Sequence, residues 1–178
     1  MILGMTTSTF TLLHVLISLV GIGSGLVVMY GALTANRMDR WTALFLVSTA
    51  ATSLTAFAFP NAHITPGIVI GVLSLVVLAI AILARYSLRL KGLWRSIFVV
   101  TAALALYFNV FVFVVQSFEK VPFLRALPPT QKEPPFAITQ LLVLILFVVA
   151  TVFAVKRFHP DSVLAGASNT AAAGKRAA

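Results

Sequence analysis

The sequence predicts an all-α fold, a transmembrane bundle of five helices. Three observations support this prediction. Hydrophobic residues make up 60% of the 178 residues and charged residues only 10%, whereas about a quarter of a soluble domain is charged. Five apolar runs are each long enough to cross the roughly 30 Å hydrocarbon layer as a helix. The segments between them are short and carry charges or prolines, which is typical of turns at a membrane surface.

The predicted spans cover residues 10–33, 41–59, 67–84, 94–118 and 136–155. Residues 1–158 therefore form one transmembrane domain, since no soluble stretch is large enough to bury a core of its own. The chain before the first run has neither a basic segment nor a small-residue cleavage site, so we expect an uncleaved first span. Residues 159–178 are rich in Ala, Gly and Ser without apolar periodicity, and we expect them to form a flexible cytoplasmic tail.

The basic residues predict the orientation, because Lys and Arg collect on the cytoplasmic side of membrane proteins. An outside N-terminus puts most of them inside: Arg37, Arg40, Arg85, Arg89, Lys91, Arg95, Lys156, Arg157, Lys175 and Arg176. Only Lys120, Arg125 and Lys132 then lie outside. We therefore expect a multi-pass protein of the cell inner membrane. The net charge of +9 is divided among short clusters between the spans, so we expect no nucleic-acid partner.

Small residues give two of the spans a face for close packing. One stripe of the first span holds His14, Ser18, Gly21 and Gly25, spaced by four, three and four residues. Gly21 and Gly25 form a GxxxG step, and Gly67 and Gly71 form a second one in the third span. Such steps let two helix backbones approach closely. They predict packing within the bundle or self-association with another copy or another membrane subunit.

Polar residues within the apolar runs mark the candidate site, because a polar side chain in lipid is costly without a partner. In the predicted orientation they lie toward the outer ends of the spans. We expect an outer polar pocket formed by His14, Ser18, Asn109, Gln116, Glu119 and Gln140. The proline-rich connection 119–135 favours an extended periplasmic strap above it. Tyr107 is predicted to face a different side. Interhelical hydrogen bonds are the competing interpretation of the same residues.

Several chemistries can be weighed against this pattern. A haem b needs two axial ligands, usually histidines on facing helices, and His14 and His63 are the candidate pair on the outer side. A quinone headgroup is an alternative, because it needs few polar contacts in an apolar cleft. No metal site is expected, since Glu119 and Glu133 with these histidines match no metal-ligand spacing. The absence of cysteine excludes thiol chemistry.

Three stretches carry a resemblance: LHVLISLVGIGSG at 13–25, LYFNVFVFVVQSFEKVP at 106–122 and PTQKEPP at 129–135. With them, the chain resembles small, uncharacterised polytopic proteins of the bacterial inner membrane. The resemblance covers the five spans but not the tail, and it implies a location without an activity.

These observations predict an integral membrane protein that acts as a non-enzymatic binding or accessory subunit, with the lipid bilayer and other membrane subunits as partners. A haem b- or quinone-linked redox component is the first alternative. A small transporter or a metal-dependent membrane enzyme is the second, although no carboxylate or lysine lies within a span, as a proton-coupled transporter would require.

Overall fold

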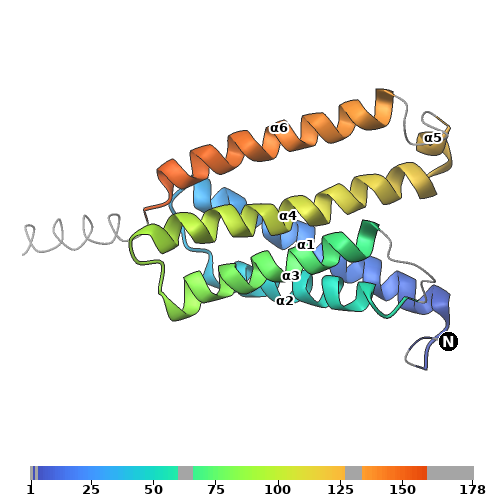
Figure 1. The fold of residues 1–178 in the computed structure, drawn as a ribbon, viewed down its shortest axis with the longest axis horizontal. Helices are drawn as coiled ribbons and strands as arrows, with labels where there is room; N and C mark the ends of the chain where they lie inside the picture. Colours follow the sequence, from blue (N-terminus) through green and yellow to red (C-terminus); the bar gives the residue numbers. More distant parts are fainter. Residues whose placement is uncertain (1, 3, 60–65, 127–133, 160–178) are drawn as a thin grey trace, which may run out of the picture.

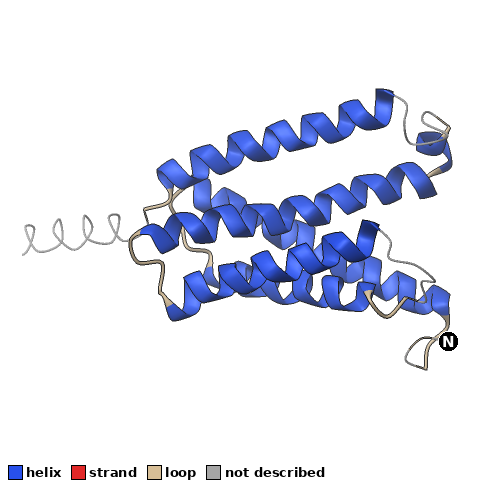
Figure 2. Cartoon of the chain, viewed as in Figure 1, coloured by secondary structure: helices blue, strands red, loops and turns tan. Residues whose placement is uncertain are grey.

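The computed structural model describes residues 2, 4–59, 66–126 and 134–159, and the described chain is almost entirely helical (Figures 1 and 2). Five long helices follow one another: α1 (Thr7–Leu33), α2 (Asp39–Ala56), α3 (Pro66–Ile82), α4 (Leu93–Lys120) and α6 (Pro134–Arg157). Two short elements join them, the π-helical turn η1 (Leu83–Ser87) and α5 (Pro122–Arg125). The predicted all-α fold is confirmed.

Four of the helical segments are long and apolar enough to cross a membrane: Thr7–Leu33, Gly67–Ser87, Leu93–Lys120 and Pro134–Arg157. Helix α2 has 18 residues and is not among them, because it begins with Asp39 and Arg40 and is rich in hydroxyl side chains. Its hydroxyls are buried inside the bundle: Thr42, Ser48, Thr49, Thr52 and Ser53. The described chain is thus a helix bundle with four candidate membrane spans, and a fifth span at α2 stays a prediction.

The long helices lie roughly along one axis, so their ends gather at two ends of the bundle (Figure 1). The N-terminus, the end of α4 and α5 lie at one end, which we call the N-terminal end. Segments 34–38 and 88–92 and the last turn of α6 lie at the other, the tail end. Large buried side chains form the core nearer the tail end, among them Phe45, Phe98, Leu106 and Phe158.

Two glycines of α1 allow α1 to pack tightly against α2 and α4. A Cβ atom placed on Gly25 would lie 2.5 Å from Leu106 Cδ1 and 2.9 Å from Phe45 Cδ2. On Gly21 it would lie 3.0 Å from Asn109 Nδ2. The GxxxG step of α1 is therefore filled by neighbours in the same chain. At Gly71 a Cβ would meet only ordinary contacts, and self-association through α3 stays a prediction.

The turns at the tail end are formed by backbone conformations that are rare for residues with a side chain. Ala35 and Met38 lie in the left-handed region with φ of 59° and 46° between α1 and α2. Arg89 and Leu90 follow η1 with φ of 50° and 58°. Such residues persist only when their surroundings hold them in place. In the first of these turns the Arg37 carbonyl accepts a hydrogen bond from Arg85 Nη2, and in the second Leu90 N donates to Ala84 O.

Candidate functional site

His14 is bonded to α2. Its Nδ1 lies 2.7 Å from Thr55 Oγ1, and its ring contacts Phe59 edge-on at 5.3 Å between centroids. The Thr55 hydroxyl also donates to Ala51 O at 2.7 Å. Because Nδ1 is engaged by Thr55, Nε2 is the ring nitrogen that would bind a ligand.

Asn109 also contacts α2. Its Nδ2 donates to Thr49 Oγ1 at 3.4 Å, beside the space left by Gly21. Thr49 is only 1% exposed. This contact joins α4 to α2 through a buried polar group, next to Gly21 of α1. It is an interhelical hydrogen bond, the competing interpretation of Asn109 in the sequence.

The remaining residues of the predicted pocket lie toward the N-terminal end. Gln116 Nε2 donates to Glu119 Oε2 at 3.1 Å, and both side chains are exposed. Gln140 Nε2 donates to Phe111 O at 3.3 Å, and Gln140 Oε1 is buried without a hydrogen-bond partner among the described residues. Ser18 donates to Val15 O within its own helix at 2.8 Å.

The structure thus divides the predicted pocket among separate contacts. His14 and Asn109 each bond to α2, Gln116 pairs with Glu119, and Gln140 bonds to the α4 backbone. A common cavity for these residues stays a prediction. His63 and residues 127–133 of the strap, like the tail from residue 160, lie outside the described residues. The sequence alone did not identify the α2 hydroxyls as the hydrogen-bond partners of His14 and Asn109, although the many hydroxyl residues of α2 indicated that this helix offers such partners.

A different concavity lies between α4 and α6. This groove has a volume of about 380 Å³ and is lined by Val100, Ala103, Leu104, Tyr107, Leu144, Phe147, Val148, Thr151, Val152, Val155 and Lys156. We call it the α4–α6 groove. Buried Ala103 is the smallest residue of its lining on α4. Leu104 and Val148 are 40% and 54% exposed, so the groove faces the surroundings of the bundle, which in a membrane are lipid.

The polar atoms of the α4–α6 groove are few and unevenly placed. Thr151 donates its hydroxyl to Phe147 O at 2.6 Å and so presents little polarity. The Tyr107 ring packs against Phe147 at 5.6 Å between centroids. Lys156 lies in the last turn of α6 at the tail end, so its charge is at one end of an otherwise apolar groove. The α4–α6 groove could not be predicted from the sequence, because its apolar lining residues do not stand out within apolar runs.

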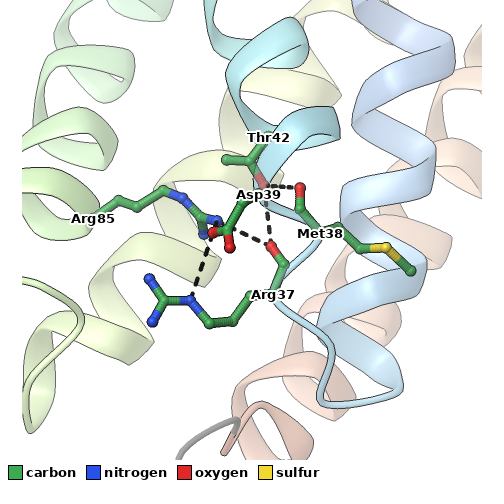
Figure 3. Close-up of polar contacts among 5 residues, drawn as sticks. All are labelled: Arg37, Met38, Asp39, Thr42 and Arg85. Carbon is green, nitrogen blue, oxygen red and sulfur yellow. Dashed lines mark hydrogen bonds and ion pairs between the residues drawn. The ribbon is translucent and has the colours of Figure 1, made fainter.

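The tail end also contains a buried cation, Arg85, which is 3% exposed and lies in η1 (Figure 3). Its Nη2 donates to Arg37 O at 3.0 Å and to Asp39 Oδ1. Its guanidinium lies over the Phe98 ring, 5.0 Å from the centroid. Arg37 Nε approaches Asp39 Oδ1 at 3.6 Å. The left-handed Met38 places its carbonyl 3.0 Å from the Thr42 hydroxyl. We call Arg37, Asp39 and Arg85 the charged triad.

The charged triad joins α2, η1 and α4 at the tail end of the bundle. The sequence predicts Arg85 just after the third span, among the basic residues on the cytoplasmic side. Instead, the π-helical turn carries it into the bundle, where burial of the charge is offset by Asp39 and by the aromatic face.

Among the described residues, no three His, Cys, Asp or Glu side chains gather closely enough to hold a metal ion.

Comparisons of the chain with protein-family models, curated proteins and solved structures find no match.

Proposed function

We propose that this chain is a five-span inner-membrane protein, with the N-terminus outside and the C-terminus in the cytoplasm, that binds the hydrocarbon chain of a lipid in the α4–α6 groove. It acts as a binding or accessory protein and not as an enzyme. The supporting observation is a groove of about 380 Å³ whose lining is apolar except for Tyr107, Thr151 and Lys156.

The dimensions of the groove suit an extended hydrocarbon chain. From Leu144 to Lys156 it follows about 18 Å of α6 at the rise of an α-helix. Membrane ligand sites are commonly apolar clefts with a few fixed polar groups. Because lipid tails are as apolar as the side chains, retention of a lipid depends on close packing in a preformed groove and not on the hydrophobic effect.

Filling the α4–α6 groove should release the lipid. Val148 lines the groove and is 54% exposed, whereas Leu146 on the same helix is 65% exposed and does not line it. After purification of the full chain in mild detergent, we expect Val148→Trp to retain at least about fivefold less lipid than wild type. The indole would displace the acyl chain, and the small energies of many lost contacts add up along the chain. Native mass spectrometry measures the retained lipid.

Leu146→Trp is the matched control, since it adds the same ring on the lipid-facing side of α6 outside the groove. It should retain lipid at the wild-type level. Equal retention by Val148→Trp and wild type would overturn the proposed site.

An absorption spectrum of the same preparation tests the alternative, because a Soret band that disappears in His14→Ala would favour haem b at His14 Nε2.

A further inference from the structure

We infer that the α4–α6 groove selects an anionic phospholipid, whose phosphate binds Lys156 while one acyl chain follows the groove toward Tyr107. This inference rests on the proposed lipid site and goes beyond it by naming the headgroup charge and the residue that recognises it.

The groove carries its charge at one end. Lys156 is the only charged residue among those that line the groove, and it lies at the end where α6 terminates. The opposite part of the groove is lined by Leu144, Phe147 and Tyr107. A ligand with an anionic head and an apolar tail fits this polarity in one direction only, with its head at the tail end of the bundle.

The ion pairs of the described residues leave Lys156 unpaired. Both ion pairs in the described part of the chain involve Asp39, which is engaged by Arg37 and Arg85. Lys156 is exposed and forms no ion pair with a described residue. Its ammonium is therefore available to a phosphate, for which lysine is a common ligand.

The tail end of the bundle around Lys156 is rich in positive charge. The described residues at the tail end include further cations, namely Arg40, Arg89, Lys91, Arg95 and Arg157, and Asp39 is their only acidic residue. Arg95, in the first turn of α4, belongs to the helix that forms the other wall of the groove. Basic residues next to a bilayer attract anionic lipids to its surface. A zwitterionic headgroup would gain less from the same field.

The test uses the full chain in nanodiscs that contain equal amounts of phosphatidylglycerol and phosphatidylcholine. After transfer to mild detergent, native mass spectrometry compares the two retained lipids. Wild type should retain phosphatidylglycerol in preference, and Lys156→Gln should lower this preference by about fivefold, the factor that corresponds to one basic residue at the surface. Lys156→Arg should restore the preference.

Arg157→Gln is the matched control, because it removes the neighbouring charge in the same turn. Arg157 lies over the Phe153 ring at 6.0 Å and does not line the groove, so this variant should keep the preference. Unchanged selectivity in Lys156→Gln, or an equal loss in Arg157→Gln, would overturn the inference. The inference would also be overturned if a second protein co-purified in place of lipid and its co-purification depended on Lys156.

The two proposals fail in distinguishable ways. Wild type that retains both lipids equally, and still loses them in Val148→Trp, would overturn the headgroup inference and leave the groove as the lipid site. Retention that is insensitive to Val148→Trp would overturn the groove itself. Matching helical circular dichroism and elution volume among the variants exclude a folding defect as the cause of either result.

Discussion

Replacing Gly25 with alanine should destabilise the bundle by about 1–3 kcal/mol, the usual cost of overpacking a filled core. The added methyl group would lie 2.5 Å from Leu106 Cδ1 and 2.9 Å from Phe45 Cδ2. Both neighbours are 1% exposed, and the cavity that they line together with Gly25 has a volume of only about 10 Å³, so it gives their side chains little space to move. Helices α1, α2 and α4 would have to separate, and the free energy of unfolding in an SDS titration of mixed micelles measures the loss.

Gly23 provides the control within the same turn of α1. No atom lies within 4 Å of a Cβ placed there, so Gly23→Ala should be neutral or slightly stabilising through its helix propensity. If Gly25→Ala is as stable as Gly23→Ala, the close packing of α1 against α2 and α4 is incorrect.

Replacing Asp39 with asparagine should cost about 2 kcal/mol, because it leaves the buried Arg85 guanidinium without its counter-charge. Breaking a fully buried ion pair costs more, but the Asp39 side chain is 69% exposed, so water screens part of the interaction. The same titration measures this loss. Arg37→Gln should have a smaller effect, since the Arg37 side chain is 41% exposed and lies 3.6 Å from the carboxylate.

A double-mutant cycle separates charge pairing from other effects of the substitution. In the Asp39→Asn background, Arg85→Met should recover most of the lost stability, because an apolar chain over Phe98 carries no charge to compensate. Additive losses in the double variant would show that Asp39 and Arg85 do not act as a pair.

The helices could be predicted from the sequence because apolar runs end where charges or prolines begin. The predicted runs 10–33, 94–118 and 136–155 differ from α1, α4 and α6 by at most three residues at either end. The third run continues past 84, because η1 extends the helix to Ser87. Local sequence alone did not show that Arg85 in this turn is buried, since its contacts with Arg37 and Asp39 join segments that are far apart in the chain.

The candidate sites were less predictable because they depend on which helices become neighbours. His14 and Asn109 were recognised as polar groups in need of partners, but Thr55 and Thr49 could be identified only once α2 was placed beside α1 and α4. The α4–α6 groove depends on the small side chain of Ala103 opposite α6, and nothing in an apolar run distinguishes a lining residue from one that faces lipid.

Cysteine labelling of the full chain tests the proposed five-span topology most directly, since the chain contains no native cysteine. Single cysteines at Ala58 and Phe123 probe the N-terminal end of the bundle, and single cysteines at Asn36 and Lys91 probe the tail end. A membrane-impermeant maleimide should label Ala58→Cys and Phe123→Cys in spheroplasts, whose inner membrane is intact, and Asn36→Cys and Lys91→Cys only after that membrane is disrupted. Labelling of Asn36→Cys and Ala58→Cys from the same side would contradict a span at α2, and labelling of Lys91→Cys in spheroplasts would contradict the cytoplasmic position of the tail end.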